Sequence, residues 1–239
     1  FNDDIINWDV SNVTDMELMF YNTTNFNQNL TNWNVSNVTN MASMFAFSTN
    51  FNGRISSWDV SNVTDMASMF ANTTNFNQNL ANWDVSNVTD MAYMFFYSSI
   101  FNQNISSWDI SNVTQIQYMF KDAASFNQDI SNWDISNINN MIGIFDNTSL
   151  STNNQCAIHT TFSASPYWEY DWSGNCDDDN DGIINSDEIA GCQDSTACNY
   201  NSSATDSGSC VYTDGVCESC SGATDGTGTV VDNDSDDDG

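Results

Sequence analysis

A 25-residue repeat governs the first 150 residues of this 239-residue chain. Three aromatic positions recur at that interval without an insertion: Phe1, Phe26, Phe51, Phe76, Phe101 and Phe126; Trp8, Trp33, Trp58, Trp83, Trp108 and Trp133; and Phe20, Phe45, Phe70, Phe95, Phe120 and Phe145. A unit this small cannot bury its own apolar face, so its copies must stack on one another. The repeat therefore predicts a solenoid in which equivalent residues of neighbouring turns lie side by side.

The spacing inside one unit predicts one short strand and one short helix in each turn. Trp8 and Val10 are two residues apart, which places both side chains on one face of a strand. Met16, Met19 and Phe20 follow the three- and four-residue spacing of a helical apolar face. We expect the methionines to lie in the core, although methionine-rich surfaces also bind partners.

Asparagine occupies two further positions of every unit: Asn2, Asn27, Asn52, Asn77, Asn102 and Asn127, and Asn12, Asn37, Asn62, Asn87, Asn112 and Asn137. A side-chain amide both donates and accepts hydrogen bonds, so a column of stacked Asn residues can satisfy itself and the nearby backbone. We expect structural ladders. N-glycosylation is the competing interpretation, because the repeated Ser-Asn-Val-Thr contains the acceptor pattern.

The sequence F-N-Q-D-I-S-N-W-D-I-S-N at residues 126–137 resembles the DUF285 repeat of BspA-like bacterial surface proteins, a relative of leucine-rich repeats. The resemblance covers residues 1–150 and rests on the recurring core W-D-V/I-S-N-V-T-x-M. It implies a right-handed, leucine-rich-repeat-like solenoid with a surface or adhesive role. The strand part departs from the usual leucine pattern, since Phe1 and Ile5 are four residues apart.

The repeat register fails at Ser151, where the next Phe is expected, and we interpret residues 151–176 as a C-terminal cap. The segment supplies large apolar side chains for this purpose: Ile158, Phe162, Tyr167, Trp168, Tyr170 and Trp172. Cys156 and Cys176 flank the segment, and a disulfide between them would close it. His159 lies inside the cap without an evident partnered nucleophile, so we expect it to be structural.

Residues 177–188 read D-D-D-N-D-G-I-I-N-S-D-E and match the spacing of a calcium-binding loop. The expected calcium ligands are the side chains of Asp177, Asp179, Asp181 and Glu188 and the carbonyl of Ile183. Gly182 permits the sharp turn. An acidic linker is the competing interpretation. No helix is expected before the loop, which resembles the calcium loops of thrombospondin type 3 repeats.

Five cysteines occur in residues 192–221, a Gly-, Ser-, Thr- and Asp-rich stretch: Cys192, Cys198, Cys210, Cys217 and Cys220. Such a stretch needs disulfides or a metal to order it, and we expect disulfides of undetermined pairing in an oxidising compartment. Zinc at the C-x-x-C pair is the alternative, without a matched four-ligand spacing. The stretch at 191–200 resembles modules of large exported Bacteroidetes proteins, which implies type IX secretion.

The acidic tail completes the expected organisation. Asp234, Asp236 and Asp238 begin the calcium spacing again without a closing acid, which makes a weak, truncated second motif. Because the chain begins in repeat register and ends inside this motif, we expect a segment of a larger protein. The expected parts are a six-turn solenoid (1–150), a cap (151–176), a calcium loop (177–191), a cysteine-containing module (192–221) and an acidic linker (222–239).

The charge balance restricts the partners of this chain. Lys and Arg number 2 against 32 Asp and Glu, a formal net charge of −30. Without basic residues to neutralise phosphates, nucleic-acid binding is not expected, and an anionic membrane surface is equally disfavoured. No apolar run approaches the roughly 18–20 residues of a membrane helix, so we expect no direct membrane insertion.

We expect an extracellular or cell-surface segment that is not an enzyme and whose partner is an extracellular protein or glycan, or further domains of the same polypeptide. Aromatic residues that break the repeat motivate this hypothesis, and stacked turns would bring four of them into one ligand-binding patch: Tyr93, Phe96, Tyr97 and Tyr118. Scattered surface aromatics are the plain alternative. A passive stalk stiffened by calcium is the second functional hypothesis, since the turns are so regular. Catalysis is disfavoured because one His, no phosphate-binding Gly loop and no paired acids were found.

Overall fold

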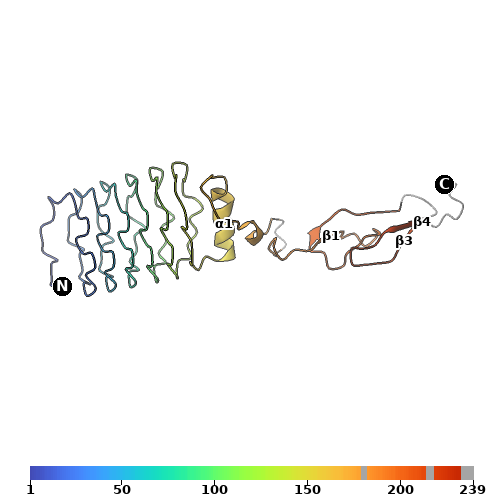
Figure 1. Ribbon diagram of the computed structural model, residues 1–239, viewed down its shortest axis with the longest axis horizontal. Helices are drawn as coiled ribbons and strands as arrows, with labels where there is room; N and C mark the ends of the chain where they lie inside the picture. The colour runs from blue at the N-terminus through green and yellow to red at the C-terminus, as the bar shows by residue number, and fades with distance from the viewer. Residues whose placement is uncertain (179–181, 214–217, 233–239) are drawn as a thin grey trace. The chain divides into compact units, whose positions relative to one another are not determined.

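The computed structural model describes residues 1–178, 182–213 and 218–232. The chain divides into two compact units, residues 1–172 and 173–239. The first unit is a series of loops followed by a helix, and the second contains a short 3-10 helix, loops and two small sheets (Figure 1).

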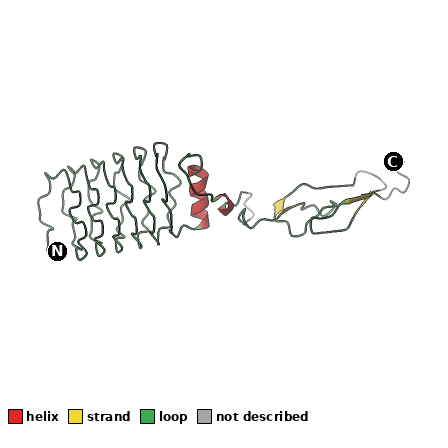
Figure 2. Cartoon of the chain, viewed as in Figure 1, coloured by secondary structure: helices red, strands yellow, loops and turns green. Residues whose placement is uncertain are grey.

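Regular secondary structure is sparse. The described elements are helix α1 (Thr152–Phe162), the 3-10 helix η1 (Ser173–Asn175) and strands β1 (Ala190–Gly191), β2 (Asp206–Ser207), β3 (Glu218–Cys220) and β4 (Val230–Asp232). Strand β1 pairs in parallel with β2, and β3 pairs antiparallel with β4. Loops and turns make up the rest of the described chain, as Figure 2 shows.

The predicted fold class, a leucine-rich-repeat-like solenoid with one short strand and one short helix in each turn, is wrong. Residues 1–150 contain loops and turns, with neither a helix nor a strand. Two residues in each loop have a positive φ, as at Ser68 (57°) and Asn72 (54°). A left-handed residue cannot continue an α-helix, so each predicted helix is replaced by successive turns.

Irregular 25-residue loops stack instead, and Figure 1 shows them side by side; we call residues 1–150 the loop stack. Backbone N–H groups alternate between two kinds of acceptor. The Ser68 N–H donates to the Ala92 carbonyl of the next loop (2.8 Å), whereas the Met69 N–H donates to Met66 in its own turn (3.1 Å). Both sets of backbone groups are thereby satisfied without a helix or a multi-residue strand.

Single-residue parallel bridges mark the contact between neighbouring loops. They join Asp15 to Asn40, Asn40 to Asp65, Asp65 to Asp90, Asp90 to Gln115 and Gln115 to Asn140. The constant 25-residue interval keeps every repeat position next to its own copies.

Aromatic ladders fill the interior of the loop stack. Phe51 and Phe76 lie 6.0 Å apart between ring centroids with 4° between their planes. Trp58 and Trp83 lie 6.4 Å apart at 5°, and the Trp83 indole N–H donates to the Ile55 carbonyl at 3.2 Å. These side chains are buried. Each buried tryptophan of the ladder therefore contributes both apolar burial and a hydrogen bond to the preceding loop: Trp33, Trp58, Trp83, Trp108 and Trp133.

The asparagine columns form hydrogen-bonded ladders along the loop stack. The Asn27 side-chain oxygen accepts a bond from the Asn52 N–H at 2.8 Å. In the second column, the Asn62 amide donates to the Ser36 carbonyl at 2.7 Å. Both columns thus link neighbouring loops, as the structural interpretation predicts.

Two side chains take the place of a further loop at the C-terminal end. The Glu169 carboxylate accepts a bond from the Gly143 N–H. The Tyr170 hydroxyl accepts one from the Phe145 N–H (3.0 Å) and donates to Asp146 (3.0 Å). Burial, together with Asp146, raises the pKa of Tyr170, so this hydroxyl stays protonated.

Helix α1 and an aromatic segment cover the last loop. Ser151 caps the helix by accepting a bond from the Asn154 N–H, and Ile158 and Phe162 are its buried residues. Phe145 of the last loop contacts three aromatic rings of the following segment, those of Trp168, Tyr170 and Trp172.

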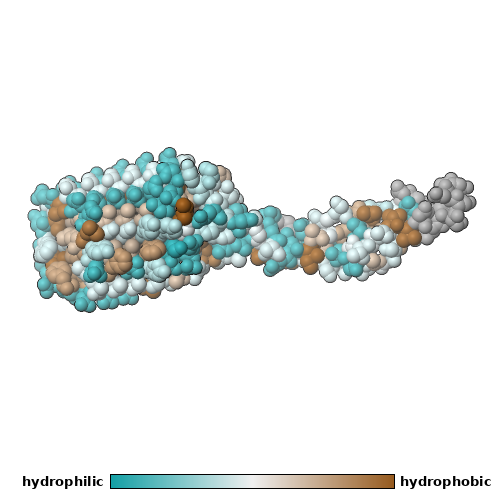
Figure 3. All heavy atoms as spheres, viewed as in Figure 1, coloured by the Kyte–Doolittle hydropathy of each residue, from teal (hydrophilic) through white to brown (hydrophobic). Residues whose placement is uncertain are grey.

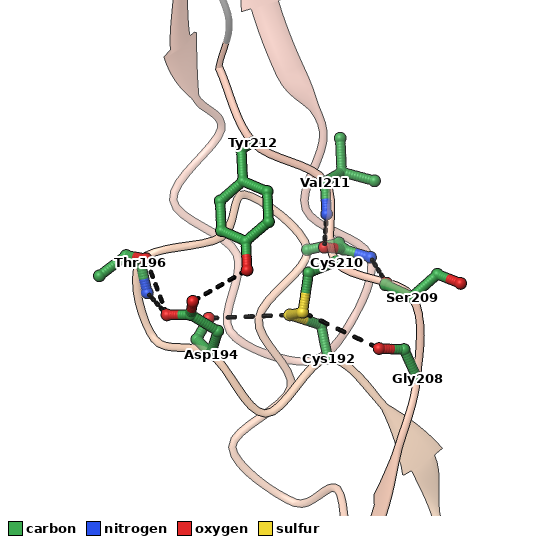
Figure 4. Close-up of a disulfide and its surroundings, with 9 residues drawn as sticks. Cys192, Asp194, Thr196, Gly208, Ser209, Cys210, Val211 and Tyr212 are labelled. Carbon is green, nitrogen blue, oxygen red and sulfur yellow. Dashed lines mark hydrogen bonds between the residues drawn. A yellow bond between two sulfur atoms is a disulfide. The ribbon is translucent and has the colours of Figure 1, made fainter.

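Disulfides cross-link the second unit. Cys192 is bonded to Cys210, and Cys198 is bonded to Cys220. Near the first bridge the Tyr212 hydroxyl donates to Asp194 at 2.9 Å (Figure 4). The prediction of disulfides is confirmed, and the zinc alternative fails because Cys220 is not a free thiolate.

The remaining cysteines are those of the predicted cap and of the C-x-x-C pair. Cys156 and Cys176 are each disulfide-bonded. Their bond to one another stays a prediction, and Cys217 lies outside the described residues.

We predict that Trp83→Ala lowers the free energy of unfolding by about 3–5 kcal/mol, because a buried indole is removed and a cavity is left. Trp8→Ala is the matched control: Trp8 holds the same repeat position but is 52% exposed, against 3% for Trp83. Its cost should be about 1 kcal/mol or less. Urea unfolding of both variants measures the difference, and equal losses would contradict the ladder as the source of stability.

We predict that Tyr170→Phe costs about 1–3 kcal/mol, because the buried Phe145 N–H loses its acceptor. Tyr167→Phe removes a hydroxyl from a residue that is 47% exposed and should change stability by less than about 0.5 kcal/mol. Thermal unfolding of the two variants tests the pair. If Tyr170→Phe left the unfolding temperature unchanged, the Tyr170 hydroxyl would not be needed to stabilise the last loop.

Candidate functional site

Four aromatic side chains on two neighbouring loops form the strongest candidate site, here called the aromatic cluster: Tyr93, Phe96, Tyr97 and Tyr118. Ring centroids are 5.1 Å apart for Tyr93 and Tyr118, and 5.6 Å for Tyr93 and Phe96. Phe96 and Tyr97 meet edge to face at 4.7 Å. The structure thus brings together all four residues of the predicted patch.

The backbone that presents these rings is common to the loops. Tyr93 and Tyr118 have φ of 59° and 56°, and Ser43 and Ser68 at the same repeat position have 55° and 57°. In the last loop this position is Gly143, where a Cβ would lie 2.6 Å from the Tyr118 ring. The tyrosine rings therefore occur on a backbone conformation that does not differ from that of the other loops. Gly143 has no Cβ, which leaves room for the Tyr118 ring.

A hollow of about 280 Å³ lies within the cluster and is lined by Tyr93, Phe96, Tyr118 and Lys121. Sites that enclose a drug-sized molecule are usually about 300–1,000 Å³, so this hollow suits one sugar ring or one side chain. It combines apolar ring faces with polar groups at the edge.

Lys121 supplies a charge that the sequence-based patch did not include. Its ammonium lies 5.3 Å from the centre of the Tyr118 ring and 3.0 Å from the Asp146 carboxylate. The hydrogen bond to Asp146 raises the pKa of Lys121, which keeps it charged. This ion pair could have been predicted from the sequence. Lys121 and Asp146 are 25 residues apart, and the repeat places residues with that separation side by side.

A family model described as a Mycoplasma protein of unknown function, DUF285, matches residues 1–99 and 77–161. The chain belongs to the DUF285 family. The match spans the loop stack and reaches into helix α1, whereas the second unit lies beyond it. Comparisons with curated proteins and with solved structures gave no match.

A second aromatic pair lies elsewhere on the DUF285 loops. Tyr21 and Phe47 hold the repeat positions of Phe96 and Tyr97, and their rings meet at 5.5 Å. The next loop carries Asn72 at the second of these positions. In the space-filling view the loop stack is largely hydrophilic with separate apolar patches (Figure 3).

The predicted calcium loop follows the DUF285 match and is only partly described. The Gly182 N–H donates to one oxygen of Asp177 at 3.1 Å, and the other oxygen of Asp177 is buried and has no hydrogen-bond partner among the described residues. Gly182 has φ of 94°, a conformation that favours glycine. A buried oxygen beside a sharp glycine turn fits the first ligand of a calcium loop.

The other predicted calcium ligands are not brought together by the described residues. Asp179 and Asp181, and the tail residues Asp234, Asp236 and Asp238, lie outside them. Within 1–178, 182–213 and 218–232, no group of three or more His, Cys, Asp or Glu residues is arranged to hold a metal. Ligation by Ile183 and Glu188 therefore stays a prediction.

His159 is a structural residue, as expected from the sequence. Its Nδ1 accepts a hydrogen bond from the Trp168 indole at 3.2 Å. The bond ties helix α1 to the aromatic segment that covers the last DUF285 loop.

In the described part of the chain, no helix has both the length and the apolarity needed to span a membrane.

Proposed function

We propose that this DUF285 chain is a non-enzymatic binding segment of a secreted or cell-surface protein, and that the aromatic cluster holds a protein or glycan ligand. The observation that carries the proposal is the meeting of Tyr93, Phe96 and Tyr118 around one hollow, with Tyr97 packed edge to face against Phe96. Partly exposed aromatic side chains gathered in one place are typical of recognition surfaces.

The chemistry of the hollow favours a ligand with both apolar and hydroxyl or amide groups. Ring faces pack against the C–H groups of a sugar or an aliphatic side chain, and tyrosine hydroxyls donate and accept at the edge. Lys121 and Asp146 form an ion pair beside the rings, which adds a donor and an acceptor. Tyr93, Tyr97 and Tyr118 sit on the backbone conformation that the loops share, so the backbone that carries these three rings is already in place before binding.

The disulfides support the proposed location. Cys192–Cys210 and Cys198–Cys220 join a stretch with few core residues, and such bonds persist in oxidising compartments. The BspA-like character suggested by the repeat is consistent with the same setting. Calcium is proposed as the cofactor of the 177–188 loop, where Asp177 offers a buried oxygen.

A passive stalk is the second candidate function. It is favoured by the regular inter-loop bonds, which repeat at every junction from the first loop to the last. In this case the aromatic cluster is a surface feature without a ligand, and the loops only space other parts of the protein.

The two candidates differ in the outcome of a binding screen with a glycan array and extracellular matrix proteins. We predict that Tyr93→Ser/Tyr118→Ser weakens ligand binding by about 30-fold or more, since loss of a central aromatic contact costs about 2 kcal/mol or more. Serine is the natural residue at this position in Ser43 and Ser68, with the same φ, so folding is preserved.

Tyr21→Ala is the matched control, because Ala46 and Ala71 hold its repeat position. It removes an exposed tyrosine elsewhere and should leave binding unchanged. Binding that survives the double substitution would contradict the aromatic cluster as the site. A wild-type chain that binds nothing in the screen would favour the stalk.

We predict that calcium raises the unfolding temperature of the second unit, with a gain of about 2.7 kcal/mol at 100 times the dissociation constant. Calorimetry is the suitable measurement, because all eight Trp residues lie within residues 1–172. Asp177→Ala/Glu188→Ala should abolish the shift. Asp178→Ala, between two predicted ligands, should retain it. An identical transition with and without calcium would reduce the loop to an acidic linker.

A further inference from the structure

Lys121 is the only lysine of the chain, and it lines the hollow of the aromatic cluster. Its ammonium donates to the Asp146 carboxylate at 3.0 Å. The same repeat position carries Ala46 and Ala71 in earlier loops, so the stacking of the loops does not require a charge there. The ion pair is therefore an addition to the framework, at the place where the aromatic rings meet.

The ion pair is accessible and held in place. The Lys121 side chain is 30% exposed and that of Asp146 is 36% exposed, so a ligand can reach both. One oxygen of Asp146 accepts from Lys121, and the other accepts from the Tyr170 hydroxyl at 3.0 Å, which fixes the carboxylate before a ligand arrives. An ammonium has three N–H groups and a carboxylate has about four acceptor sites, so the pair keeps capacity for further hydrogen bonds.

The charges around the hollow disfavour ionic ligands. The hydrogen bond to Asp146, together with the charges of Asp146 and Asp122, raises the pKa of Lys121, and two carboxylates against one ammonium leave this edge negative. An anionic ligand is repelled there and by the formal net charge of −30 over the whole chain. A cationic ligand meets the Lys121 ammonium, which already lies 5.3 Å from the centre of the Tyr118 ring.

A neutral apolar side chain fits the rings but conflicts with the ion pair. It would exclude water from Lys121 and Asp146 without offering new hydrogen-bond partners, which is unfavourable. A sugar ring avoids this conflict, because its C–H groups pack on the aromatic rings while its hydroxyls donate and accept. Tyr93 and Tyr118, with ring centroids 5.1 Å apart, supply the apolar surface. The hollow therefore favours an uncharged molecule rich in hydroxyl groups.

We propose that the ligand of the aromatic cluster is a neutral glycan, with one sugar ring packed on the aromatic rings and two adjacent hydroxyls bonded to the Lys121–Asp146 pair. This inference rests on the proposed binding function of the cluster and names its ligand class. Adjacent hydroxyls suit the pair because the Lys121 nitrogen and the Asp146 oxygen are 3.0 Å apart. One hydroxyl accepts from the ammonium while its neighbour donates to the carboxylate.

The test is calorimetric titration of the intact chain with unsubstituted, neutral hexasaccharides of glucose, mannose, galactose and xylose. We expect saturable binding of at least one of them. Its affinity should change by less than about twofold between about 0.1 and 1 M sodium chloride, although the screening length falls from about 10 to 3 Å over this range. A charged ligand bound at this partly exposed site would lose affinity over the same range.

Lys121→Ala tests the role of the ion pair. It should weaken binding of that hexasaccharide by about tenfold or more, because a hydroxyl loses a charged donor. Alanine is the natural residue at this position in Ala46 and Ala71, so folding is preserved. Arg54→Asn is the matched control. It removes the other basic side chain of the chain, its repeat position carries Asn in neighbouring loops, and it should leave the affinity unchanged.

Three results would overturn the neutral glycan while the binding function stands. One is that no hexasaccharide binds at millimolar concentration, whereas a matrix protein binds and is lost in Tyr93→Ser/Tyr118→Ser. Another is that hexagalacturonate or a hexalysine peptide binds in place of the neutral sugars and loses affinity at high salt. The third is hexasaccharide binding that needs the tyrosines but is unchanged by Lys121→Ala.

Failure of the binding function itself has a different signature. Hexasaccharide binding that survives Tyr93→Ser/Tyr118→Ser would place the sugar outside the aromatic cluster. A chain that binds none of the sugars, peptides or matrix proteins would contradict both the function and the ligand class.

Discussion

The loop stack depends on one arrangement of the backbone, in which successive N–H groups donate alternately to the next loop and to their own turn. The alternation requires two left-handed residues in each loop, and every such residue with a side chain costs about 1–2 kcal/mol. The bonds between loops and the buried aromatic ladders offset this cost. Neither a helix nor a sheet is needed, because the successive N–H groups find acceptors without one, as each N–H from Met66 to Thr73 does.

Because of this backbone arrangement, the residues at each repeat position form a column along the loop stack, either on its surface or in its interior. A substitution in one loop therefore gains or loses a contact with the residues one loop before and after. Replacing Ser by Tyr at the positions of Tyr93 and Tyr118 brings two rings within 5.1 Å without a change of φ. Lys121 and Asp146 meet by the same rule. Local recognition chemistry can thus be built on an unchanged framework.

The period, the buried aromatic columns and the grouping of the aromatic cluster were predictable from the sequence, because a strict repeat places equal positions together. The absence of a strand and a helix from each loop was not predictable from the sequence. Met16, Met19 and Phe20 have helical spacing, yet the left-handed residues between such positions are Leu, Ser or Tyr, and only Gly143 signals a positive φ. The roles of Glu169 and Tyr170 depend on a missing neighbour, which no local pattern reveals.

The side-chain cap has a consequence for how this protein can vary. Glu169 and Tyr170 bond to backbone N–H groups, and those groups occur in the same geometry in each loop. Duplication or loss of one 25-residue unit in the gene would leave every remaining junction, and the cap, with the same donors and acceptors. The length of this region is therefore free to evolve in whole steps, while its two ends keep their structure.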